Sequence, residues 1–176
     1  MNKVIERGAY GTVIEPMTIQ IQRRLPGPVD RVWAYLTDSD LRRKWLASGE
    51  MELKVDAPFK LTWRNDELSG GAAGRPEGMS AENSMESRIT ALDPNKRLSF
   101  TWGQGEVTFD LEPLGDVVLL TVTHRRISNR ENMLMIGAGW HMHLDTLVAR
   151  MTDAETEPFW EGWKKLKADY DARIPR

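Results

Sequence analysis

Apolar and polar residues alternate along many short stretches of this chain, and such a period of two predicts half-buried β-strands. The clearest run extends from Met17 to Gln22, where every second residue is apolar, and it ends at the prolines within 25–28. The same alternation occurs at 51–53, 59–63, 88–92, 98–102, 107–111 and 117–124. Because short turns separate most of these stretches, we expect the strands to pair antiparallel.

Other stretches repeat their apolar residues every three or four positions, which predicts helices. One helix covers 29–36, and a second short one follows the capping sequence Thr-Asp-Ser-Asp at 37–40. Ser128 is expected to cap a long helix over 128–152, because six apolar side chains of that segment fall within about 80° of arc. These are Met133, Ile136, Trp140, Leu144, Leu147 and Met151. A last helix is predicted from the spacing of Phe159, Trp163, Leu166 and Tyr170.

The stretch 65–84 is polar and rich in glycine, so we expect a mobile loop. It lacks the Gly-Lys-Ser/Thr sequence that follows the glycines of a phosphate-binding loop. Residues 1–12 carry mixed charges and two glycines, and we interpret them as a tail or an extension of the sheet edge. Residues 13–176 are expected to form one α+β domain, with helices on one face of an antiparallel sheet.

The composition is that of a globular domain and excludes several classes of function. Of the 176 residues, 40% are hydrophobic and 28% are charged, and the net charge is −2. Without a basic excess, we expect no nucleic-acid partner. There is no cysteine, which excludes disulfides and thiolate chemistry. The chain shows neither an apolar run of about 20 residues nor the apolar core of a signal peptide, so we expect a cytoplasmic protein without membrane insertion.

Six stretches of the sequence resemble one protein superfamily. They are LPGPVDRVWAYLTD (25–38), RKWL (43–46), LSFTW (98–102), VTFDLEP (107–113), LTVTH (120–124) and AGWHMHLDTL (138–147). Together they resemble the START-like or polyketide-cyclase-like (SRPBCC) superfamily over roughly residues 13–173. Within it, the chain is similar to the branch of the C-terminal domain of the heat-shock-protein-90 ATPase activator. Ala57-Pro58 departs from the usual Gly-Gly of this family, and with the 65–84 loop it could alter the mouth of a cavity.

The resemblance implies a helix-grip fold. In this fold a curved antiparallel sheet of six or seven strands wraps around a long C-terminal helix, with two short helices after the first strand. Members commonly bind lipids, sterols, polyketides or plant hormones in an internal cavity, and a minority catalyse cyclisations or dehydrations. Because a fold alone does not assign a function, three hypotheses stay open. The protein binds a small apolar or amphipathic molecule, it is a cyclase or dehydratase, or it is a co-chaperone-like interaction module with a chaperone as partner.

Ten residues are candidates for a ligand-binding wall, because their strand parity or helical angle turns them toward the space between sheet and long helix. They are Trp63, Phe100, Trp102, Phe109, Leu120, His124, Trp140, His143, Leu144 and Leu147. An apolar wall with a few polar groups is typical of small-molecule sites. His124 and His143 would be those polar groups, selecting a ligand with a hydroxyl, carbonyl or carboxylate. The alternative is that both histidines are paired within the core and that the aromatic residues only fill it.

The sequence offers little for metal or covalent catalysis. His141 and Asp145, four residues apart, could share a helix face, but no third metal ligand is visible. The carboxylates within 106–112 alternate with apolar residues and should face solvent, and no Gly-x-Ser-x-Gly nucleophile motif occurs. We therefore expect no catalytic residue, no metal and no cofactor, with the 65–84 loop at the mouth of the cavity.

Overall fold

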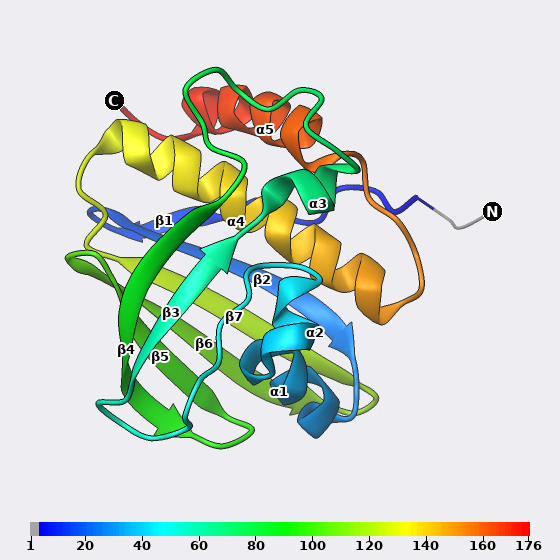
Figure 1. Cartoon of the computed structure of the whole chain (residues 1–176), viewed down its shortest axis with the longest axis vertical. Helices are drawn as coiled ribbons and strands as arrows, with labels where there is room; N and C mark the ends of the chain where they lie inside the picture. The colour runs from blue at the N-terminus through cyan, green and yellow to red at the C-terminus, as the bar shows by residue number, and fades with distance from the viewer. Residues whose placement is uncertain (1–3) are drawn as a thin grey trace.

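A curved antiparallel sheet of seven strands organises the fold, as the computed structural model of residues 4–176 shows (Figure 1). The strands are β1 (Thr12–Glu15), β2 (Thr18–Pro26), β3 (Pro58–Trp63), β4 (Asn83–Asp93), β5 (Arg97–Trp102), β6 (Gly105–Leu114) and β7 (Val117–Arg125). Their spatial order is β1-β2-β7-β6-β5-β4-β3, and every neighbouring pair is antiparallel. The predicted α+β helix-grip fold is confirmed.

Among the described residues, five helices complete the fold: α1 (Val29–Thr37), α2 (Ser39–Arg43), α3 (Asn65–Ser69), α4 (Arg130–Met151) and α5 (Phe159–Arg173). The long helix α4 crosses one face of the sheet, and α5 lies along the side of α4 that is turned away from the sheet (Figure 1). Helices α1 and α2 contribute apolar side chains to the same core as the sheet and α4. Within residues 4–176, no helix is both long enough and apolar enough to cross a membrane.

Helix α4 is buried on two sides, whereas its sequence predicted one apolar stripe. Trp140, Leu144 and Leu147 lie in the core between the helix and the sheet. Leu134 and Met142 belong to a second hydrophobic cluster that packs against α5. This second interface is why small and polar residues of α4 are also withdrawn from solvent.

The N-cap of α4 is Asn129, one residue later than predicted. Its side chain accepts a hydrogen bond from the backbone N–H of Asn132, as a capping side chain does. Ser128 lies just before the cap, and its hydroxyl is 2.5 Å from the side-chain nitrogen of Asn132. The predicted cap was therefore wrong by one position, while the helix itself is confirmed.

A buried arginine fixes the segment between α2 and β3. The guanidinium of Arg42, which is 1% exposed, donates to the carbonyls of residues 36, 37, 47 and 49. Burial lowers the pKa of Arg42 to about 10. The indole of Trp45 donates to the carbonyl of Tyr35 at 2.8 Å. These contacts hold the backbone at Trp45, whose own carbonyl takes part in the site described below.

Two local predictions were wrong. Residues 51–53 form no strand, because the backbone turns there, with the N–H of Lys54 bonded to the carbonyl of Glu52 and a positive φ of 71° at Asp56. Strand β3 pairs with β4 instead. The 65–84 stretch is also not all loop, since it begins with the short helix α3 and its last two residues start β4.

Candidate functional site

A cavity of about 320 Å³ opens between the ends of β3, β4 and β5 and the two long helices α4 and α5. This volume is at the lower end of the range for small-molecule sites. Its wall consists of Trp63, Asn65, Met79, Asn83, Met85, Trp102, Met135, Ile136, Gly139, Trp140, His143, Phe159, Trp160 and Trp163. Since no Asp, Glu, Lys or Arg is among them, the wall carries no permanent charge.

Six aromatic rings contribute to this wall. The ring centroids of Trp63 and Trp102 are 5.1 Å apart, and those of Trp102 and Trp140 are 5.6 Å apart. On the opposite side, the rings of Phe159 and Trp160 from α5 meet edge to face at 5.2 Å. Such contacts hold large flat side chains in fixed orientations. The wall therefore presents a largely apolar surface with several flat faces.

His143 is a polar group in this wall. Its Nδ1 lies 2.8 Å from the carbonyl oxygen of Trp45, and its ring packs on Phe159 with centroids 4.7 Å apart. The side chain is buried, and burial lowers the pKa of His143 to about 4. The imidazole is therefore neutral near pH 7.

His124 lies behind the wall. Its Nδ1 accepts a hydrogen bond of 3.0 Å from the indole N–H of Trp140, and its ring is 5.0 Å from that of Trp102. Burial lowers the pKa of His124 to about 4, so it too is neutral. Its contacts show that it positions two tryptophans of the cavity.

The 65–84 segment covers one side of the cavity and is attached to α5. The indole N–H of Trp160 donates to Asp66 at 2.8 Å, and its backbone N–H donates to the hydroxyl of Ser69 at 3.1 Å. Asn65 and Met79 of the segment line the cavity. The side-chain oxygen of Asn65 is buried and has no hydrogen-bond partner within residues 4–176.

Four of the ten candidate residues line the cavity: Trp63, Trp102, Trp140 and His143. The other six, Phe100, Phe109, Leu120, His124, Leu144 and Leu147, are buried but do not border it. Their orientation toward the space between sheet and helix is as expected. Where these residues lie, however, the sheet and α4 pack directly on each other and form the core. These six therefore lie in the core and not in the wall of this cavity, because the open space lies at one end of that interface.

The contribution of α5 to the wall was not predicted from the sequence. Phe159, Trp160 and Trp163 line the cavity together with Met135 of α4 and Met85 of β4. The periodicity of the last helix was visible, but nothing in it indicated that α5 would close a space left by α4. The missed residues come from elements that meet only in the folded chain.

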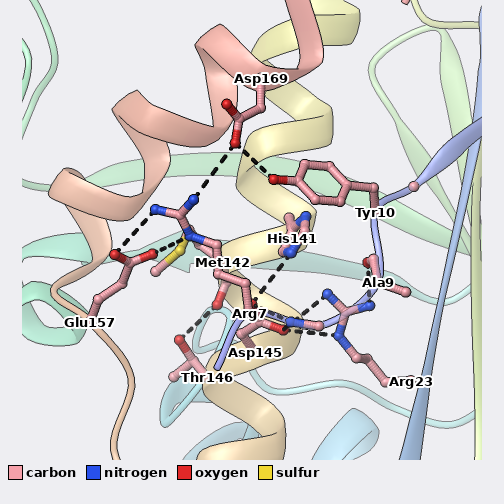
Figure 2. Close-up of polar contacts among 12 residues, drawn as sticks. Arg7, Ala9, Tyr10, Arg23, His141, Met142, Asp145, Thr146, Glu157 and Asp169 are labelled. Atoms are coloured by element: carbon pink, nitrogen blue, oxygen red, sulfur yellow. Dashed lines mark hydrogen bonds and ion pairs between the residues drawn. The ribbon is translucent and has the colours of Figure 1, made fainter. Parts of the chain in front are cut away.

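A second polar cluster lies away from the cavity, where β2, α4 and the N-terminal segment meet (Figure 2). Arg23 of β2 and Asp145 of α4 form a buried ion pair at 2.9 Å, and the backbone N–H of Gly8 donates to the same carboxylate. His141 lies between Asp145, at 3.4 Å, and the hydroxyl of Tyr170, at 2.9 Å. His141 and Asp145 therefore share a face of α4, as predicted, and Arg23 forms the ion pair with Asp145.

The same cluster attaches the N-terminal segment to α5. Arg7 reaches Glu157 at 2.6 Å and Asp169 at 3.6 Å, and the hydroxyl of Tyr10 donates to Asp169 at 2.7 Å (Figure 2). The ionisable groups of this cluster face one another. In the part of the chain that the structure describes, no three His, Asp or Glu side chains converge as a metal site would require.

Comparisons with known proteins agree with this architecture. A family model described as "Activator of Hsp90 ATPase homolog 1-like protein" matches residues 26–152. The solution structure of the protein encoded by gene BPP1335 from Bordetella parapertussis is 31% identical, with a TM-score of 0.80 over 97% of this chain and 93% of that chain. A search of curated proteins found no match.

Two further solved structures share the fold at lower identity. CalU16 from Micromonospora echinospora is 23% identical, with a TM-score of 0.64 over 95% of this chain and 96% of that chain. DynU16, a protein in the dynemicin biosynthetic locus, is 17% identical, with a TM-score of 0.64 over 81% of this chain and 49% of that chain.

Proposed function

This chain belongs to the family of activator of Hsp90 ATPase homolog 1-like proteins, within the START-like superfamily, and from this we propose that it binds an uncharged, largely aromatic small molecule. The observation that carries the proposal is the cavity of about 320 Å³, whose wall holds six aromatic side chains and no charged one. An apolar pocket with few polar groups is what small-molecule sites usually present. The family and the fold support a ligand-binding protein.

The neutral wall narrows the class of ligand. A carboxylate or ammonium group placed there would lose its hydration and find no opposite charge, which costs several kcal/mol. Fatty acids are therefore poor candidates, although the sequence had left amphipathic molecules open. A flat, uncharged ring system loses little on desolvation and gains contact with the indole faces.

The tryptophans make binding directly measurable. Five of the seven tryptophans in the chain line the cavity, so intrinsic fluorescence should report occupancy. We expect saturable quenching by an uncharged polycyclic compound such as flavone, and no comparable response to palmitate. Native mass spectrometry of freshly purified protein should also detect a co-purifying small molecule.

A cavity-filling substitution tests the location. Gly139 borders the cavity, and a Cβ there would meet only the indole nitrogen of Trp163, at 4.0 Å. Gly139→Leu should therefore fold and fill the space, weakening flavone binding by more than about tenfold. Gly137→Ala is the matched control, because its Cβ would meet Ile19 and Tyr170 at ordinary contact distance outside the cavity.

Two outcomes would refute the proposal. One is the absence of saturable binding for every uncharged aromatic compound tested. The other is equal affinity in Gly139→Leu and the wild-type chain. In the first case the interaction-module hypothesis, with a chaperone as partner, becomes the stronger one, whereas in the second case the ligand binds outside this cavity.

A further inference from the structure

The tautomer of His143 determines which polar group the cavity can accept. The Nδ1 of His143 lies 2.8 Å from the carbonyl oxygen of Trp45. A carbonyl oxygen has no proton to give, so Nδ1 must carry the hydrogen and donate it. A neutral imidazole has only one N–H, which leaves Nε2 as a bare acceptor. Within residues 4–176, no hydrogen bond occupies this Nε2.

The surroundings of His143 keep the imidazole in this state. The side chain is 6% exposed, and burial lowers its pKa to about 4. Its ring neighbours are the uncharged rings of Phe159 and Trp140. No carboxylate borders the cavity that could favour the imidazolium. Near neutral pH, Nε2 of His143 can therefore accept a hydrogen bond but cannot donate one.

From this polarity, and resting on the proposed function, we infer that the cavity selects an uncharged ligand with a hydroxyl group that donates its hydrogen to His143 Nε2. A ketone, ether or ester oxygen has no hydrogen to donate and would face the lone pair of Nε2. A carboxylate is excluded on the same ground and because the wall holds no cation. A phenol or alcohol satisfies the acceptor without bringing a charge.

The wall also holds two amides, Asn83 of β4 and Asn65 of α3. The buried side-chain oxygen of Asn65 has no partner within the described residues, and the residue lines the same cavity. An amide offers both a donor and an acceptor. Asn65 can therefore pair with either kind of polar group, and the preference for a donor comes from His143.

The test uses four probes with one ring system: 2-naphthol, 2-methoxynaphthalene, 2-acetylnaphthalene and 2-naphthoate. Dissociation constants are measured by calorimetry at neutral pH. We expect 2-naphthol to bind at least about tenfold more tightly than its methyl ether, because the ether leaves a buried acceptor unpaired. The ketone and the carboxylate should bind no better than the ether.

Replacing the acceptor should remove the selectivity. In His143→Leu, the affinities for 2-naphthol and its methyl ether should become equal within about twofold. If this variant does not fold, nitrogen NMR of the wild-type protein gives an independent readout. The Nε2 resonance of His143 should have the shift of an unprotonated nitrogen, and it should move when 2-naphthol binds but not when the ether binds.

The outcomes separate this inference from the proposed function. If none of the probes binds, both are overturned. If the naphthol and its ether bind equally, or if the naphthoate binds most tightly, the selectivity is wrong while ligand binding stands. Retention of the naphthol preference in His143→Leu, or a protonated Nε2 in the free protein, also overturns the role given to His143.

Discussion

Acidification is expected to destabilise this protein through its three histidines, all of which are buried in the neutral form. Burial lowers the pKa of His124 and His143 to about 4 and that of His141 to about 3, where Arg23 adds to the effect. In the unfolded chain a histidine has a pKa near 6.5. Between these values the unfolded chain binds more protons than the folded protein. Stability is therefore full above pH 6.5 and is lost as the pH falls through the window from 6.5 toward 4.

The size of this loss follows from the same values. Each histidine removes about 1.4 kcal/mol of stability for each pH unit below 6.5. At pH 5 the three together remove about 6 kcal/mol. Asp145 acts in the opposite sense, because burial raises its pKa, although Arg23 opposes that rise. We therefore expect a net loss of about 4 to 6 kcal/mol, which is comparable to the total stability of many domains.

Urea denaturation at a series of pH values from 7.5 to 5 measures this effect. Unfolding free energies are obtained by linear extrapolation from tryptophan fluorescence and far-ultraviolet circular dichroism. The Arg43–Glu67 and Arg130–Asp171 ion pairs do not obscure the window, because the pKa values of their acids are lowered and they titrate below it. The histidine contribution is therefore separable from ordinary acid denaturation.

A variant identifies the histidines as the source. In His124→Gln the amide oxygen can still accept the hydrogen bond of Trp140, but the group no longer titrates. The loss of stability between pH 6.5 and 5 should then shrink by about one third, whatever the stability of the variant at pH 7. An unfolding free energy that changes by less than about 1 kcal/mol from pH 7 to 5.5 would refute the neutral burial of these residues.

Three further predictions concern stability at neutral pH, all measured by urea denaturation. Trp140→Ala should lower the free energy of unfolding by about 3–5 kcal/mol, because it leaves a hole in the core and removes the indole N–H that donates to His124. A loss below about 1 kcal/mol would contradict this packing. Asp145→Ala should cost about 3–5 kcal/mol, since it leaves Arg23 buried without its counter-charge. Gly8→Ala should cost about 1–3 kcal/mol, because its Cβ would lie 2.5 Å from Arg23 Nε, and unchanged stability would show that the N-terminal segment is not held there.

Periodicity predicted most of the elements because one side of each is buried. Strands such as β6 and β7 face the core with every second residue, and α4 faces the sheet with one stripe. The prediction failed at 51–53, where Met51 and Leu53 flank the polar Glu52 and so imitate the alternation of a strand. Leu53 is 43% exposed, so its apolar character reports no burial, and three residues carry too little pattern to distinguish a strand from a turn.

The position of the cavity could not be read from the same pattern. Parity states which face of a strand a residue occupies, but not how far along the strand the sheet separates from the helix. Trp102 and Phe100 share a face of β5, yet only Trp102 borders the cavity, while Phe100 packs on Phe59 and Phe109. A void depends on the distance between elements, which no local sequence pattern contains.

The last helix explains why family membership alone is a weak guide to the ligand. The family match covers 26–152, and α5 begins at Phe159, beyond its end. Yet α5 supplies Phe159, Trp160 and Trp163 to the cavity wall. Trp160 also donates a hydrogen bond to Asp66 in the 65–84 segment, which lines the same cavity. The matched region supplies His143 and the ends of β3, β4 and β5, which form another part of the cavity wall. Under the proposed function, the size and shape of the ligand depend on a part of the chain that the family pattern does not describe, so relatives with different last helices should accept different molecules in the same fold.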